Sequence, residues 1–226
     1  MKKQEVYDRN YIVSKLKQLS HKHNILNVFN DFLSMAAYSI SNSVSFNQAL
    51  ENQYLNIINK YEKDEQDLFP KMFASLINSL NPEEFNDVLG TIFEELELQN
   101  KFKGQFFTPQ HICDLMNEIT LNKDEVIKAI DTRGYFSMSE PACGSGRLVY
   151  SLLKFMHDNN INFHKNVYIE ATDVSNLCAY MTYIQLSLYG ANAKVICGNT
   201  LTNEVYETFY TPMFRIMPIL PKEGVA

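Results

Sequence analysis

The sequence predicts an α/β protein in two parts, a helical domain over residues 1–100 and a domain built on a parallel sheet over residues 101–226. Three observations lead to this prediction. Apolar residues recur at helical spacing through the first part, short β-rich apolar runs alternate with helical segments in the second, and no glycine precedes Gly90. A chain of 226 residues is long enough to bury a substantial hydrophobic core.

The first part contains four segments with helical periodicity, at residues 24–40, 45–61, 64–80 and 81–98. Pro70 either kinks the third of these helices or starts a new one. The fourth is predicted to open with Asn81 as N-cap, Pro82 at the first helical position and acids in the first turn. No repeat and no linker of biased composition interrupts these segments, so we expect a compact helical bundle.

The second part alternates between predicted strands and predicted helices. The strands are the short apolar runs at residues 136–140, 167–173 and 193–199. The segments between them, residues 146–160 and 175–190, have helical character, and the second ends at Gly190 as a C′ residue. This order implies right-handed crossovers and a parallel sheet, with ligands bound beyond the carboxyl ends of its strands.

The stretch SEPACGSGRLV, residues 139–149, joins the first predicted strand to its helix. Gly144 and Gly146 lie in this connection, where glycine permits positive φ and lets a ligand approach the backbone. The alternative is a tight turn that binds nothing. Position 149 is valine, so the full GxGxxG pattern of a dinucleotide fold is missing. The loop therefore indicates where a ligand binds without naming it.

Three further features mark the same region, each with two interpretations. Asp173 ends the second strand, where its carboxylate either accepts hydrogen bonds from ribose hydroxyls or caps the next helix. Asn199 ends the third strand and either reads an adenine edge or forms a turn with Gly198. The segment GQFFTPQHICDLM, residues 104–116, either lays an aromatic ring against a base or is a packed helix entry, with Pro109 at the start of the helix.

In combination, GQFFTP, EPACGSGRLV, an acid after the second strand and GNTL resemble the N-6 adenine DNA methyltransferases. The similarity is greatest to the modification subunits of type I restriction systems. It covers residues 104–201 well and the first hundred residues loosely. The resemblance implies a Rossmann-like methyltransferase fold that binds S-adenosylmethionine, a helical N-terminal domain, and methyl transfer to the amino group of adenine in DNA.

The resemblance also assigns cofactor contacts, one position at a time. The segment that wraps the cofactor corresponds to Phe106, Phe107, Thr108 and Pro109. The cofactor loop corresponds to Glu140, Pro141, Ala142, Cys143, Gly144, Ser145 and Gly146. Asp173 matches the ribose-binding acid, and Asn199 stands where the family usually has an aspartate near the cofactor adenine.

The chain departs from the family at the catalytic motif, an (N/D)PP(F/Y) tetrapeptide that holds and stacks on the flipped adenine. The sole counterpart is TPMF, residues 211–214, after a possible fourth strand at residues 204–210. The catalytic assignment therefore falls on Thr211, Pro212 and Phe214. Thr211 is too short to replace the amide, and losing a positioned polar group typically costs about 2.7–4 kcal/mol of transition-state stabilisation.

Two functions follow from the resemblance. The first is an enzyme that transfers a methyl group from S-adenosylmethionine to adenine in DNA. The alternative is a catalytically deficient, methyltransferase-like protein that acts as an accessory or regulatory subunit, such as a restriction-modification modulator encoded on a mobile element. The predicted sheet is shorter than the family's and leaves an edge to be covered or paired. We therefore expect DNA to be bound with a partner subunit or as an oligomer.

Composition sets limits on these functions. The formal net charge of −6 argues against nucleic-acid binding by the chain alone, although Lys101, Lys103 and Arg147 could form a small basic rim near the cofactor. No apolar run approaches the roughly 18 residues that cross a bilayer, and the first residues lack the apolar core of a signal peptide. The 4 cysteines form no CxxC pair, so we expect a reduced cytoplasmic compartment and no metal site.

Overall fold

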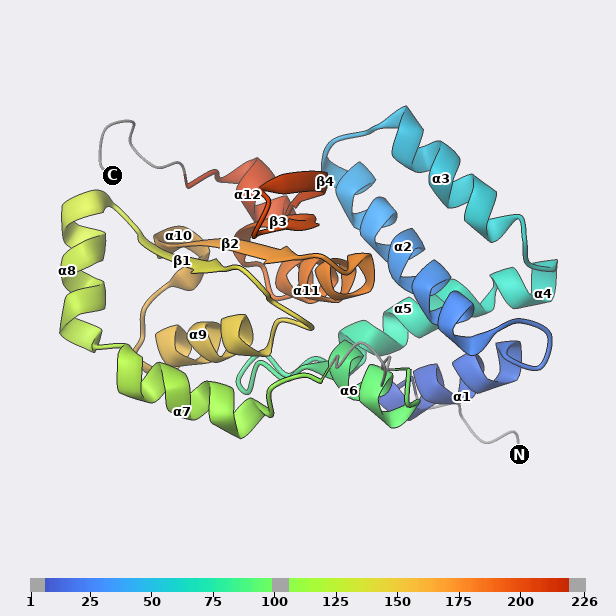
Figure 1. Cartoon of the computed structure of the whole chain (residues 1–226), viewed down its shortest axis with the longest axis horizontal. Helices are drawn as coiled ribbons and strands as arrows, with labels where there is room; N and C mark the ends of the chain where they lie inside the picture. Colours follow the sequence, from blue (N-terminus) through green and yellow to red (C-terminus); the bar gives the residue numbers. More distant parts are fainter. Residues whose placement is uncertain (1–6, 99–105, 220–226) are drawn as a thin grey trace.

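The computed structural model of the protein describes residues 7–98 and 106–219, in which helices pack around a four-stranded sheet (Figure 1). The first part contains the helices α1 (Arg9–Leu19), α2 (Ile25–Val44), α3 (Gln48–Ile58), α4 (Lys63–Gln66), α5 (Leu68–Ser79) and α6 (Val88–Glu95). Helix α1 has no counterpart among the predicted segments. Side-chain oxygens of Asp8, Asn24 and Asn47 accept backbone N–H groups at the starts of α1, α2 and α3, respectively.

Two predictions for this part have clear outcomes. The segment at residues 64–80 divides before Pro70, because α4 ends at Gln66 and a new helix begins at Leu68. The prediction of a helix from Asn81 is wrong. Phe85 has a φ of 52°, which ends the first turn, and the helix begins only at Val88 with Asp87 as its N-cap.

The second part contains the sheet and its crossover helices. Its elements are α7 (Gln110–Thr120), α8 (Lys123–Arg133), β1 (Phe136–Glu140), α9 (Arg147–Asp158), α10 (Phe163–Asn166), β2 (Val167–Asp173), α11 (Asn176–Leu188), β3 (Asn192–Asn199), β4 (Glu204–Tyr210) and α12 (Pro212–Ile216). The strand order is β1-β2-β3-β4, with the first three parallel and β4 antiparallel to β3. The predicted α/β fold, an incomplete Rossmann-like sheet behind an N-terminal helical region, is confirmed.

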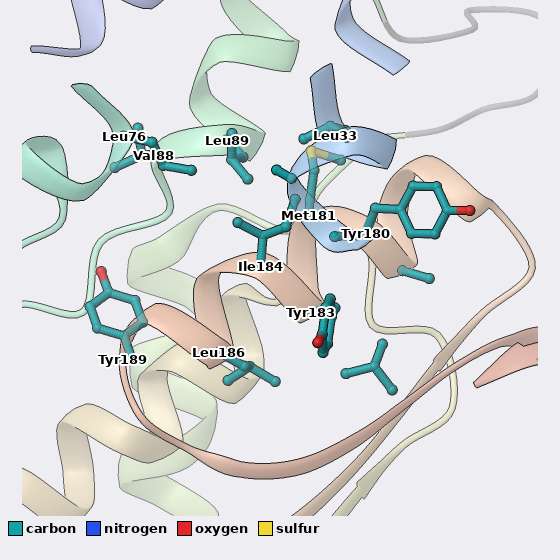
Figure 2. Close-up of a cluster of buried hydrophobic side chains, with 14 of the residues drawn as sticks. Leu33, Leu76, Val88, Leu89, Tyr180, Met181, Tyr183, Ile184, Leu186 and Tyr189 are labelled. Atoms are coloured by element: carbon teal, nitrogen blue, oxygen red, sulfur yellow. The ribbon is translucent and has the colours of Figure 1, made fainter. Parts of the chain in front are cut away.

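Helix α11 lies between the sheet and the N-terminal helices. Residues 178–186 within it are all buried, as expected of a helix with packing partners on every side. Figure 2 shows Met181 directed toward Leu33 of α2, while Tyr183 and Leu186 lie on the side of the sheet. Buried side chains of both predicted domains belong to one continuous core. The predicted boundary at residue 100 therefore divides the sequence but not the core.

One face of the sheet packs against the layer that contains α11. Val167, Ile169 and Ala171 of β2 are fully buried toward the layer that contains α11, while the residues between them are half-buried. On this side Phe209 of β4 stacks with Tyr38 of α2 at a ring separation of 6.4 Å.

In the described ranges, no helix has both the length and the apolar character that a membrane crossing requires.

Ile184 tests the central position of α11, because its side chain is fully buried. We expect Ile184→Ala to lower the free energy of unfolding by about 2–5 kcal/mol, since it removes buried methyl groups and leaves a cavity. Leu201→Ala, at a side chain that is 95% exposed, should change it by less than about 0.5 kcal/mol. Urea unfolding measures both, and similar losses in the two variants would contradict the packing described.

Candidate functional site

The sequence-predicted residues of three strand ends meet at one edge of the sheet. The cofactor loop, residues 140–146, follows β1, Asp173 ends β2, and Asn199 ends β3. Because these strands are parallel, their carboxyl ends lie on the same side. The N–H of Cys143 donates to the carbonyl of Thr172 at 2.9 Å, which joins the loop to the end of β2.

The two glycines of the loop have backbone angles that favour glycine. Gly144 has a φ of 55° and Gly146 a φ of 100°. A Cβ at Gly144 would lie 3.1 Å from the ring of Phe107, and one at Gly146 would lie 2.5 Å from the ring of Tyr150. The loop is therefore a tight turn, as one interpretation predicted, and it also brings the backbone against an aromatic side chain of the predicted wrapping segment.

Asp173 holds the loop in place. Its Oδ2 accepts the N–H of Gly144 at 2.9 Å, and its Oδ1 accepts the N–H of Ser175 at 2.8 Å. Burial raises the pKa of this carboxyl above its usual value, although these two N–H groups act in the opposite direction. A carboxylate has about four lone-pair sites, so about two stay free for further donors. Asp173 thus holds both the loop and Ser175, the N-cap residue of α11, and still has the capacity to accept ribose hydroxyls.

A cavity of about 290 Å³ opens beside the loop. Its walls combine the predicted segments with α7 and α9, and its lining residues are Phe106, Phe107, Thr108, Cys113, Met116, Glu140, Ala142, Cys143, Gly144, Ser145, Arg147 and Leu148. The size approaches the lower end of ordinary small-molecule sites, and the mixed polar and apolar lining is typical of them. Asp173 and Asn199 lie at the same sheet edge but outside this lining.

The predicted side chains around the cavity differ in exposure. Phe107 packs against Phe93 at a ring separation of 5.4 Å, so it forms part of the wall, whereas Phe106 is 69% exposed. Glu140 accepts the N–H of Ala142 at 3.0 Å and so folds back on its own loop. Pro109 is the N-cap residue of α7 and contributes to a neighbouring cavity instead.

Asn199 forms a local turn. Its Oδ1 accepts the N–H of Leu201 at 3.0 Å, and in the described part of the chain its Nδ2 has no hydrogen-bond partner. The next residue, Thr200, donates its hydroxyl to the carbonyl of Pro141 at 2.7 Å and so ties this turn to the cofactor loop. The turn therefore forms with the residues that follow Asn199 and not with Gly198, which lies within β3, and the amide nitrogen stays free.

The structure adds one group that the sequence analysis missed, the carboxylate of Asp87 at the start of α6. Its Oδ2 accepts a hydrogen bond from the hydroxyl of Ser145 in the loop at 2.6 Å. It accepts a second from Nε of Arg147, in the first turn of α9, at 2.8 Å. Arg147 also forms two hydrogen bonds with Glu94, at 2.6 and 3.0 Å. A signal was present in the sequence, since Asp87, Gly90 and Glu94 are spaced to share one helix face.

This network corrects the prediction of a basic rim. The side chain of Arg147 is only 10% exposed and is paired with two carboxylates, so it presents no free positive charge to DNA. The other two predicted members, Lys101 and Lys103, lie outside the described residues. The described residues also contain no group of three or more His, Cys, Asp or Glu side chains placed to hold a metal ion.

The TPMF segment, residues 211–214, does not join this site. Thr211 is fully buried, and its hydroxyl donates to the carbonyl of Ala191 at 2.7 Å and accepts the N–H of Ala193 at 3.0 Å. Both partners lie at the amino end of β3, whereas the cofactor loop lies at its carboxyl end. The loop is hydrogen-bonded to Thr172 and Asp173, which pair with Ile196 and Cys197 of β3. A strand rises about 3.3 Å per residue, so about 10–13 Å along β3 separates this level from Ala193.

Phe214 has aromatic neighbours of its own. Its ring stacks on Tyr210 at 5.0 Å and lies 5.9 Å from the ring of Tyr168 of β2. These contacts cover the face of the sheet opposite α11. The segment therefore packs on the sheet at the end remote from the loop.

Comparison with known proteins identifies the family. The family model for N-6 DNA methylases matches residues 84–217, more than half of the chain. The chain belongs to this family. The match begins before the predicted domain boundary and includes α6 with its Asp87 network.

Two curated relatives of this N-6 DNA methylase chain are type I restriction enzyme methylase subunits. The MpnII subunit of Mycoplasma pneumoniae is 27% identical over 150 residues, which is 62% of this chain and 26% of the relative. The MjaVIII subunit of Methanocaldococcus jannaschii is 26% identical over 145 residues, 59% of this chain and 22% of the relative. The chain spans about a quarter of the length of these relatives, and the resemblance inferred from the sequence is confirmed.

A search of solved structures finds a putative class I S-adenosylmethionine-dependent methyltransferase from Listeria monocytogenes. The match has a TM-score of 0.41 and 16% identity, and it covers 76% of this chain and 52% of that one.

The loop glycines can be tested against a matched control. Gly134 also has a positive φ, 89°, but a Cβ there would meet nothing within 4 Å. We expect Gly134→Ala to lower the free energy of unfolding by about 1 kcal/mol, and Gly146→Ala by about 1–3 kcal/mol more because of the Tyr150 clash. Urea unfolding of both variants measures the difference, and equal losses would show that the ring moves aside freely.

Proposed function

We propose that this chain binds S-adenosylmethionine and serves as the cofactor-binding component of an adenine N-6 DNA methylation system. The observation that carries the proposal is that the cofactor loop and residues Phe106, Phe107 and Thr108 line one cavity of about 290 Å³, while Asp173 anchors the loop from outside that lining. Membership of the N-6 DNA methylase family supports S-adenosylmethionine as the cofactor. The type I methylase subunits among its relatives support a restriction-modification setting.

The residues present fit the cofactor. Asp173 has lone pairs left for the ribose hydroxyls after accepting two backbone N–H groups, and Asn199 has a free amide nitrogen for the adenine. In the described chain, no side chain caps the start of α9, which leaves first-turn N–H groups for a carboxylate. When bound, S-adenosylmethionine supplies an electrophilic methyl group. The chain's own part is then to orient that group and exclude water from it.

Val174 and Leu201 extend this assignment. Both follow strand ends at the site, and their side chains are 62% and 95% exposed. Single exposed apolar side chains are common on protein surfaces, so the position of these two beside the loop, and not their exposure, supports the assignment. We assign them to the flanks of the bound nucleoside, where neither could be recognised from the sequence alone.

Of the two functions open from the sequence, we propose the accessory one for the described residues. The TPMF segment lies at the amino end of β3 and is engaged in closing the sheet. Thr211, Pro212 and Phe214 therefore have no route to a base held near the cofactor loop. We propose that the pocket for the target adenine comes from a partner subunit, which also supplies the contacts to DNA.

The affinity for S-adenosylmethionine should fall as the pH drops through the raised pKa of Asp173. Protonation removes an acceptor from the N–H of Gly144 and from the ribose, and the raised pKa places this loss above the usual aspartate value of 3.8. The thiols of Cys143, Cys178 and Cys197 stay neutral, because burial raises their pKa. Calorimetry from acid to neutral pH measures the effect.

Asp173→Asn is the control for that titration. It should bind at least about tenfold more weakly at neutral pH, a loss of about 1.4 kcal/mol, and lose the acid-dependent decline. An unchanged affinity would show that Asp173 is only a helix cap. No detectable binding of S-adenosylmethionine by the unaltered chain would refute the proposed function itself.

A methyl-transfer assay tests whether the chain needs a partner to act on DNA. We expect the chain alone to transfer no label from S-adenosylmethionine to mixed-sequence DNA, because Phe214 is packed between Tyr210 and Tyr168. Phe214→Ala should leave cofactor affinity unchanged and lower only the stability. Transfer by the chain alone would contradict the proposal, and loss of that transfer in Phe214→Ala would return the TPMF segment to catalysis.

A further inference from the structure

The carboxylate of Asp87 connects the helical part of the chain to the cofactor loop. Its side chain is 2% exposed and accepts four hydrogen bonds. Oδ2 accepts from Ser145 and Arg147 at 2.6 and 2.8 Å. Oδ1 accepts from the N–H of Gly90 at 2.8 Å and from Nε2 of Gln185 at 3.1 Å. One buried side chain thus contacts the loop, α6, α9 and α11.

The loop has two separate sets of anchors. Asp173 and Thr182 hold Gly144, through its N–H at 2.9 Å and its carbonyl at 3.0 Å. Asp87 holds the side chains on either side of Gly146. Because Gly146 has a φ of 100° and no side chain of its own, the direction in which the loop enters α9 depends on these two neighbours.

Charge makes this anchor specific. The guanidinium of Arg147 lies between Asp87 and Glu94, with its side chain only 10% exposed. Neutralising Asp87 would leave Arg147 paired with Glu94 alone and would remove the charge that holds its Nε against the start of α6. Gly90 reinforces this, since a Cβ there would collide with the Asp87 carboxylate and with Ser145. The loop and α6 are therefore fixed to one another.

Helix α6 contributes no residue to the lining of the cofactor cavity, although Ser145 and Arg147 both line it. We propose that Asp87 is a positioning residue for S-adenosylmethionine: it fixes the cofactor loop in its binding arrangement before the cofactor arrives and couples α6 to the cavity. This inference rests on the proposed function. Its physical basis is preorganisation, because the apparent affinity falls in proportion to the fraction of molecules whose loop is already in place.

Asp87→Asn is the most informative variant. The asparagine oxygen can still accept the N–H of Gly90 and keep α6 capped, but the amide has no charge to pair with Arg147. We expect the affinity for S-adenosylmethionine, measured by calorimetry, to fall at least about tenfold in a protein that remains folded. An affinity within twofold of the unaltered chain would overturn the proposal.

Asp31→Asn is the matched control. Asp31 is also a buried acid, 10% exposed at its side chain, and it accepts from Tyr61 at 2.9 Å and from Lys60 at 3.4 Å in the helical part. It should lose stability comparably and keep its cofactor affinity within twofold. An equal loss of affinity in both variants would show that general destabilisation, and not loop positioning, is responsible, and would also overturn the proposal.

Hydrogen exchange in the unaltered chain gives a test that does not depend on a variant folding. The N–H of Gly90 donates to the side-chain Oδ1 of Asp87. The N–H of Val28 donates to the backbone carbonyl of Asn24 at 2.9 Å, at the start of α2. Saturation with S-adenosylmethionine should slow exchange at Gly90 at least several-fold more than at Val28. Equal slowing overturns the coupling while leaving the proposed function intact, whereas absence of cofactor binding refutes the proposed function directly.

Discussion

The side-chain amide of Gln185 uses its hydrogen-bonding capacity to join three parts of the molecule. From the middle of α11 its Oε1 accepts the N–H groups of Val88 and Leu89 at 2.8 and 3.1 Å, which are orphan donors at the start of α6. Its Nε2 donates to Asp87 and to Tyr150. A buried amide is tolerated only when such bonds are made, so this residue admits one arrangement of α6, α9 and α11.

That constraint explains which parts of the fold the sequence could predict. Strands β2 and β3 could be predicted because a buried parallel strand is a local apolar run, whereas β1, also expected to be buried, is the edge strand and alternates between half-buried and exposed residues. The start of α6 was placed too early, at Asn81, because its real determinants are distant. Gln185 caps it from 97 residues away, and Arg147 pairs with Asp87 across 60 residues. Local signals cannot contain such contacts, and Arg147 was accordingly interpreted as part of a basic rim.

The candidate site was predictable to a different extent. Residues at the ends of parallel strands converge by geometry, so Asp173, Asn199 and the loop could be grouped from the sequence alone. The hydrogen bond from the N–H of Gly144 to Asp173 could not be predicted from the sequence, because it depends on how the loop closes. The placement of the TPMF segment could have been predicted. The connection at residues 200–203 is too short for a crossover, so β4 must return antiparallel and carry the segment to the other end.

Because β4 runs antiparallel to β3, the cofactor loop and the TPMF segment lie at opposite ends of the sheet. The cofactor loop, Asp173 and the exposed Val174 and Leu201 lie at or just after the carboxyl ends of the strands. The residues once assigned to the target base lie at the amino ends, where the Thr211 hydroxyl is fully engaged with β3. A group held at one end of a sheet cannot act at the other, since the strands between them are rigidly paired. On the proposed function, recognition of adenine therefore depends on other residues, and the cavity beside the loop is the place that these residues have to reach.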